Sequence, residues 1–94
     1  MSNPGISVAL PVSRADPALL ARAVRCVQNQ SLSELDITLI LNGSDAPTTA
    51  AARNIAASDR RFRILELPRA NLAAALNLAL HEARYELVAR MDAD

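Results

Sequence analysis

The sequence predicts an α/β protein: a Rossmann-like parallel sheet with the element order βαβαβαβ and the strand order 3-2-1-4. Three observations predict this fold: apolar strand-like runs alternate with helical segments, helix-start signals separate them, and each strand can return parallel only through a crossover. The 94 residues are assigned to one domain, residues 1–94. In such a sheet all strands end at one edge, where ligands bind at the reversal of winding.

Two strands and a helix are expected in the first half of the chain. Residues 6–12 alternate large and small apolar side chains, as in a buried strand, and residues 36–41 form an unbroken β-branched run, as in a strand covered on both faces. Between them, Asp16-Pro17 predicts the start of a helix that runs to about Gln30. The expected core stripe of this helix is Leu20, Val24 and Val27, with Cys26 packed beside it.

The second half repeats the alternation twice. An Ala-rich helix over residues 46–57 leads to a strand over 62–67, whose charges favour a sheet edge, and Arg60, Arg61 and Arg63 are expected to be solvated there. Asn71 is a suitable cap for the last helix, and residues 86–91 form a fourth strand. The apolar stripe predicted for the last helix is Leu72, Ala75, Leu76, Ala79, Leu80 and Ala83.

The composition excludes several classes of function. Ten basic residues balance ten acidic ones, and one Phe and one Tyr offer no stacking platform, so no nucleic-acid partner is expected. A single cysteine, Cys26, excludes a disulfide framework and a cysteine-built zinc site. No segment has the pattern of a signal peptide or a membrane span. We therefore expect a cytoplasmic protein, at the inner face of the membrane if a longer parent is anchored there.

The most informative motif is Asp92-Ala93-Asp94. In extended backbone, residues two apart face the same side, so both carboxylates can bind one hard divalent cation whose remaining ligands are phosphate oxygens. Taken alone, the pair is more typical of a solvated turn than of a metal site, but its place directly after an apolar strand reverses this preference and favours a metal site. The candidate site joins this pair to Pro11-Val12-Ser13, with Asn42-Gly43-Ser44 one strand away.

From Ile6 to Asp94 the sequence resembles the family 2 glycosyltransferases, which have the A-type nucleotide-sugar-binding fold. Leu72-Ala73-Ala74-Ala75-Leu76-Asn77 is similar to the family's Gly-Leu-Ala-Ala-Ala-Leu-Asn helix, and Ala89-Arg90-Met91-Asp92-Ala93-Asp94 resembles its Ala-Arg-Met-Asp-Ala-Asp-Asp. Residues 7–12, 23–32 and 42–44 also match family segments in the same order.

The resemblance implies transfer of a sugar from a nucleoside diphosphate sugar, of the UDP type, to an acceptor such as a glycan or polysaccharide precursor. It further implies inversion and a Mg²⁺ or Mn²⁺ cofactor. The roles it assigns are nucleotide binding for Pro11, Val12 and Ser13, base contact for Asn42, donor contact for Asn77, ribose or metal contact for Asp92, and metal binding for Asp94. Because Asn42 replaces a family Asp and can both donate and accept, a uridine preference does not follow automatically.

The resemblance also implies that this chain is the donor half of a longer enzyme. The family continues with another Asp and an acceptor-binding half that supplies the general base, so no catalytic residue is assigned and the chain alone is expected to be inactive. A non-catalytic nucleotide-binding or interaction remnant remains an alternative. A dinucleotide-binding enzyme is a weaker one, because Pro11-Val12-Ser13 is followed by no glycine-rich turn. The unpaired fourth strand is expected to promote self-association.

Overall fold

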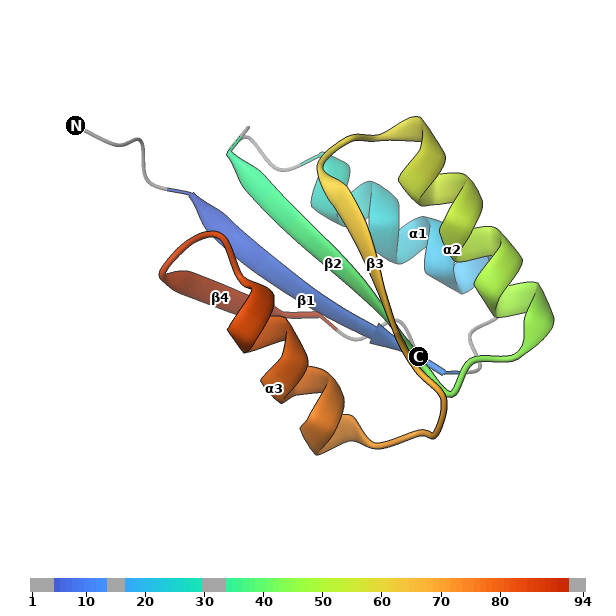
Figure 1. Cartoon of the computed structure of the whole chain (residues 1–94). Helices are drawn as coiled ribbons and strands as arrows, with labels where there is room; N and C mark the ends of the chain where they lie inside the picture. Colours follow the sequence, from blue (N-terminus) through green and yellow to red (C-terminus); the bar gives the residue numbers. More distant parts are fainter. Residues whose placement is uncertain (1–4, 14–16, 30–33, 92–94) are drawn as a thin grey trace.

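The computed structural model describes residues 5–13, 17–29 and 34–91, which form a parallel sheet with helices on both faces (Figure 1). The elements are β1 (Ile6–Val12), α1 (Pro17–Gln28), β2 (Leu35–Asn42), α2 (Ala46–Ser58), β3 (Phe62–Leu67), α3 (Leu72–Glu82) and β4 (Leu87–Arg90). The strand order is β3-β2-β1-β4, so the predicted class, element order and strand order are confirmed. Helix α1 ends two residues before the predicted position, and its predicted cap, Asp16, lies outside the described residues.

All strands run in the same direction, so their carboxyl ends share one edge of the sheet. β1 pairs with β2 along its whole length, from Ile6 opposite Leu35 to Val12 opposite Leu41. β4 pairs only with the first part of β1 and reaches the level of Ala9, where Arg90 is its partner. The last backbone bond of this pair runs from the Met91 amide to the Ala9 carbonyl, at 2.9 Å.

The two faces of the sheet are covered unequally. Helices α1 and α2 lie on one face and α3 lies on the other (Figure 1). The larger core, under α1 and α2, includes the fully buried Leu10, Leu20, Ile37 and Leu39. The smaller core, under α3, consists of Ala9, Ile40, Ala75 and Ala79. None of the helices within the described ranges is long and apolar enough to cross a membrane.

The expected packing of Cys26 is wrong, because this residue is exposed. The buried side of α1 carries Leu20, Val24 and Val27, as predicted. Cys26 follows Val24 by two positions, which turns its side chain by about 200° around the helix axis. It therefore points away from the stripe that Val24 contributes to the core.

The apolar stripe predicted for α3 is only partly buried. Ala75 and Ala79 are buried, whereas Leu72 is 44% exposed and Leu80 is 57% exposed. Small side chains allow α3 to lie close to the sheet. Because no second helix among the described residues flanks α3 on this face, the larger leucines beside the Ala face remain in contact with solvent.

The expectation of a solvated basic edge is wrong for Arg61 and Arg63. The Arg63 guanidinium pairs with Asp36 at 2.9 Å, and the side chain of Asp36 is only 3% exposed. Arg61 pairs with Asp59 at 3.0 Å and lowers the pKa of that carboxyl to about 2. Arg60 is exposed, as predicted. The edge position predicted for β3 is confirmed.

Candidate functional site

The segment Asn42–Asp45, formed by the last residue of β2 and the loop that leads to α2, connects three neighbouring strand ends. Towards β1, the Ser44 hydroxyl donates to the Val12 carbonyl at 2.6 Å, and the Asp45 amide donates to the Ser13 carbonyl at 3.4 Å. Towards β3, the Gly43 amide donates to the Leu67 carbonyl at 2.9 Å. These bonds fix the ends of β1, β2 and β3 relative to one another at the carboxyl edge.

Asn42, the last residue of β2, extends this set of contacts to α3. Its side chain is buried, and its Oδ1 accepts a hydrogen bond from the Asn71 amide at 2.7 Å. The side chain of Asn71 in turn caps α3 by accepting from the Ala74 amide at 3.0 Å, so the predicted cap is confirmed. This bond uses one of the two lone pairs of Oδ1, so Asn42 retains the Nδ2 donor and one acceptor position for a ligand.

Gly43 is required by the close approach of two loops. It has a φ of +62°, and a Cβ added there would lie 2.6 Å from the Ala70 backbone nitrogen. A side chain would meet both a backbone conformation that L-residues avoid and a fixed main chain. Glycine therefore allows the turn after β2 to pack directly against the loop that leads into α3.

The other predicted binding residues differ in what they can present to a ligand. Val12 is 1% exposed and belongs to the larger core, so only its main chain is available at the edge. Pro11 is buried, and Ser13 is half-buried beside Asp45. Asn77 is exposed on α3, six residues past the cap, or about 9 Å along the helix axis. Asn77 is thus set apart from the bonded loops.

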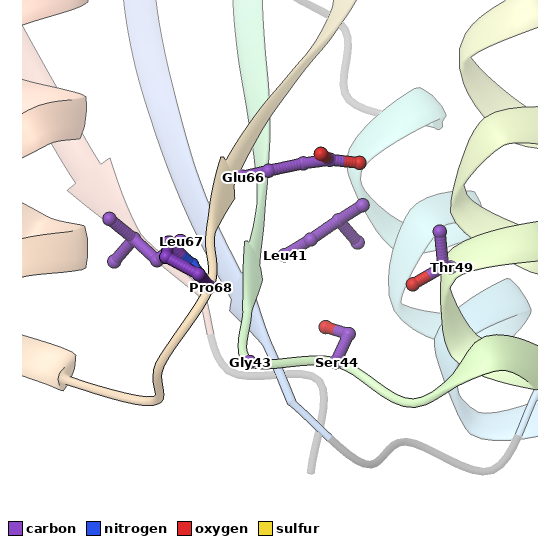
Figure 2. A pocket seen from close by; sticks show the side chains of 7 residues that line it. All are labelled: Leu41, Gly43, Ser44, Thr49, Glu66, Leu67 and Pro68. Atoms are coloured by element: carbon purple, nitrogen blue, oxygen red, sulfur yellow. The ribbon is translucent and has the colours of Figure 1, made fainter.

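A pocket of about 420 Å³ opens at the ends of β2 and β3. Its polar lining consists of the Ser44 and Thr49 hydroxyls and the Glu66 carboxylate, and Glu66 also pairs with Arg53 of α2. Figure 2 shows Glu66 extending from β3 on the side where α2 lies. The remaining lining residues are Leu41, Gly43, Leu67 and Pro68.

Sequence reasoning did not single out Thr49 or Glu66. Glu66 could have been found from its place near the end of a strand, directly before Leu67-Pro68. Ligands bind at the carboxyl ends of the strands in a parallel sheet, and this rule pointed to Asn42 and Asp92. Thr49 lies in the first turn of a weakly amphipathic helix, and nothing in its local sequence distinguishes it from its neighbour Thr48.

The paired acidic residues Asp92 and Asp94 lie outside the described residues. Within the described part of the chain, no three His, Cys, Asp or Glu side chains gather in a way that could hold a metal ion. The chemistry of the pair itself fits a divalent cation, because carboxylate oxygens are the ligands that Mg²⁺ and Mn²⁺ prefer.

Curated relatives match almost the whole chain. The O-antigen biosynthesis glycosyltransferase WbnJ of Escherichia coli is 32% identical over 90 residues, which cover 95% of this chain and 35% of WbnJ. An uncharacterized glycosyltransferase of Haemophilus influenzae is 30% identical and matches 100% of this chain but 38% of its own length. The putative glycosyltransferase EpsH of Bacillus subtilis is 24% identical, with 27% of its length covered. This chain therefore spans roughly a third of the length of these relatives.

A solved structure shares the fold. The mannosyltransferase PcManGT from Pyrobaculum calidifontis, in complex with GDP-Man and Mn²⁺, superimposes with a TM-score of 0.85 at 24% identity, over 99% of this chain and 28% of that protein. The similarity shows that the parallel sheet described above is part of an A-type glycosyltransferase fold. The model of the glycosyl transferase family 2 matches residues 7–94, and the chain accordingly belongs to this family.

Proposed function

We propose that this chain is the donor-binding part of a metal-dependent, inverting glycosyltransferase. The enzyme would move a sugar from a nucleoside diphosphate sugar to an acceptor such as a glycan or polysaccharide precursor. The observation that carries the proposal is the bonded junction of three strand-end loops at the edge where this class of sheet binds its ligands. Two similar proteins support the donor and acceptor classes, since PcManGT is in complex with GDP-Man and WbnJ is named for O-antigen biosynthesis.

We assign the metal to Asp92 and Asp94. Arg90 pairs with Ala9 in the β1–β4 register, and Asp92 and Pro11 are each two residues further along their segments, which supports a metal site at the end of β1. A bound Mg²⁺ or Mn²⁺ would neutralise the charge that develops on the diphosphate leaving group. The presence of Mn²⁺ in the PcManGT complex agrees with this choice of cofactor.

We assign the nucleotide to the loops that Asn42–Asp45 connects. Pro11, Val12 and Ser13 would border the base and ribose, with Val12 contributing only its main chain. Asn42 would contact the base through Nδ2, because the Asn71 amide uses part of the acceptor capacity of Oδ1 while Nδ2 is a pure donor. A donor at this position pairs with a carbonyl oxygen, which uracil and guanine both present. Asn77 would lie beside the sugar of the donor.

Calorimetry with UDP and GDP, each with and without Mn²⁺, tests the assignment. We expect Mn²⁺ to strengthen binding, and we expect Asp94→Ala to abolish the enhancement. The matched control is Glu86→Ala, which removes an exposed carboxylate near the start of β4 and should leave the enhancement unchanged. Equal affinity with and without metal, in a folded sample, would contradict the assignment.

Asn42→Asp tests the role of the base contact. The new carboxylate could still accept from the Asn71 amide and would offer a second acceptor to the uracil imide. Guanine carries the same kind of ring N–H donor, whereas the ring N3 of cytosine is an acceptor, so we expect the affinities for UDP and GDP to rise relative to that for CDP. An unchanged ratio would show that residue 42 does not contact the base.

We also propose that the general base belongs to a part of the parent enzyme outside residues 1–94. No residue of this chain is assigned a catalytic role, and the isolated chain should not transfer sugar from UDP-glucose or GDP-mannose to water or to an added glycan. Measurable release of nucleotide by the purified chain would contradict this proposal.

The outer edge of β4 is proposed as a site of self-association. Among the strands of the described residues, β4 is paired with β1 alone, and Leu87 is 63% exposed. An apolar strand with an unpaired edge can pair with a second chain. Light scattering should show association that Leu87→Lys reduces, and a monodisperse monomer at every concentration would contradict it.

A further inference from the structure

The amino edge of the sheet, opposite the site, contains a buried polar cluster centred on Asp36. Asp36 accepts from the Ser7 hydroxyl at 3.0 Å, from Arg63 Nε and Nη2 at 3.1 and 2.9 Å, and from the Arg84 amide at 2.9 Å. Ser7 Oγ also accepts from the Tyr85 amide at 3.1 Å. The cluster therefore joins β1, β2 and β3 to the connection between α3 and β4.

The cluster requires a carboxylate at position 36. All of the groups that bind the Asp36 carboxylate are hydrogen-bond donors. An Asn side chain at this position would direct its own amide hydrogens against at least one of these donors. Burial by itself raises the pKa of Asp36, but hydrogen bonds from the Arg84 amide, Ser7 and Arg63 outweigh this effect and lower the pKa. Asp36 of β2 is thus an ionised acceptor that binds donors from β1, from β3 and from the connection between α3 and β4.

β4 depends on this anchorage more than the other strands do. It has four residues with largely exposed side chains, and within the described part of the chain it pairs with β1 alone. In a parallel pair, a slip of two residues keeps each side chain on its own face and moves the strand end by about 6.6 Å. Little apolar burial opposes such a slip, whereas the bonds to the Arg84 and Tyr85 amides fix the chain directly before Leu87.

We propose that Asp36 is a positioning residue for the metal site. From the opposite edge of the sheet it fixes the register of β4, the strand that leads into Asp92 and Asp94. The inference rests on the proposed function for the identity of the metal ligands. Asp36, at the amino edge of the sheet, thereby contributes to the affinity for the metal.

The test compares Asp36→Asn with Asp59→Asn in the 94-residue chain. Asp59 is a matched control, because it also accepts from an arginine, Arg61, and its side chain is 15% exposed, but it lies in the turn between α2 and β3. Mn²⁺ alone is titrated into isotope-labelled protein, and the paramagnetic broadening of the Met91 amide signal gives the midpoint. We expect Asp36→Asn to raise the midpoint about ten-fold and Asp59→Asn to leave it unchanged.

Hydrogen exchange provides the second readout. Relative to the central Leu39 amide, the Met91 amide should lose protection in Asp36→Asn and keep it in Asp59→Asn, which separates a local effect on β4 from global destabilisation. If Asp36→Asn does not fold, Ser7→Ala removes only the hydroxyl that binds Asp36 and Tyr85 and should give the same changes at smaller size.

The outcomes separate the two proposals. A wild-type Met91 signal that Mn²⁺ does not affect would refute the metal assignment and this inference together. A normal Mn²⁺ titration in the wild type with an unchanged midpoint in a folded Asp36→Asn or Ser7→Ala would overturn the positioning role alone. Equal losses of affinity in Asp36→Asn and Asp59→Asn would overturn it as well, since they would reduce the effect to general stability.

Discussion

Gly43→Ala should destabilise the fold at the point where the strand-end loops meet. The φ of +62° costs an L-residue about 1–2 kcal/mol. The new Cβ would lie 2.6 Å from the Ala70 backbone nitrogen, so the two loops must separate. Separation weakens the bonds from Gly43 to Leu67 and from Asn71 to Asn42, at about 1 kcal/mol each.

The lower entropy of the unfolded Ala chain offsets about 0.4–1 kcal/mol of this cost. The net loss is about 2–3 kcal/mol, which lowers the Tm of a domain of this size by about 10–20 °C. Urea and thermal unfolding followed by circular dichroism measure it. The double variant Gly43→Ala with Ala70→Gly serves as a control and should recover little, because the nearest atom is the main-chain nitrogen of residue 70 rather than its Cβ. A loss below about 0.5 kcal/mol, or full recovery in the double variant, would refute the reasoning.

Three further predictions follow from burial and charge. Arg61 lowers the pKa of Asp59 from 3.8 to about 2, so the stabilisation is complete above pH 3.8 and is lost as the pH falls towards 2. Because Arg61 is partly exposed, Asp59→Asn should cost about 1 kcal/mol in urea unfolding at pH 7 and almost nothing near pH 2, and an equal cost at both would contradict the pairing. Cys26 should react with Ellman's reagent in the folded protein, whereas protection until unfolding would place its thiol in the core. Leu39→Ala should cost about 2–5 kcal/mol and Leu80→Ala less than about 0.5 kcal/mol, and similar costs would show that Leu80 is buried in solution.

The architecture could be predicted because each local signal agreed with the others. The alternation in residues 6–12, the unbroken apolar run of β2 and the Asn71 cap are all short-range patterns, and each matches an observed element closely. The order β3-β2-β1-β4 places the charged β3 at one edge and the short β4 at the other, as the sequence pattern favoured.

The errors concern features that depend on what covers a surface. Periodicity assigned Leu72 and Leu80 to a buried stripe, but burial of a helical face requires a neighbour on each flank, and α3 is the one helix of the described residues on its side of the sheet. Arg63 was expected in solvent because it belongs to a basic cluster, with Arg60 and Arg61, at the edge of the sheet. Its partner Asp36 is distant in the sequence, on another strand, and only the register of β2 and β3 brings the two side chains together.

The candidate site also has features that the sequence predicts and features that it does not. Asn42 and Ser44 were predicted from their position after a strand, and they do lie at the carboxyl edge with direct bonds to neighbouring loops. That Asn42 binds the α3 cap, and that Val12 contributes only main chain, follow from side-chain directions set by pairing and packing. Such directions are fixed by the tertiary structure and have no local sequence signal.

Asp36 and Asn42 together explain how α3 is attached to the sheet despite its small apolar contact. Its buried residues are Ala75 and Ala79, with Leu76 partly buried beside them, which is a small apolar contact for a helix of eleven residues. Asn42 binds the amide of the cap residue that begins α3, and Asp36 binds the Arg84 amide just after the helix ends. Arg63, the partner of Asp36, also donates to the Glu82 carbonyl in the last turn, at 2.6 Å.

Asp36 and Asn42 lie an even number of residues apart on β2, with Ile40 between them in the core under α3, so both face this helix. Two polar residues of one central strand thereby fix both ends of α3, and in doing so they connect the carboxyl edge, where the nucleotide is proposed to bind, with the anchorage of β4 at the amino edge.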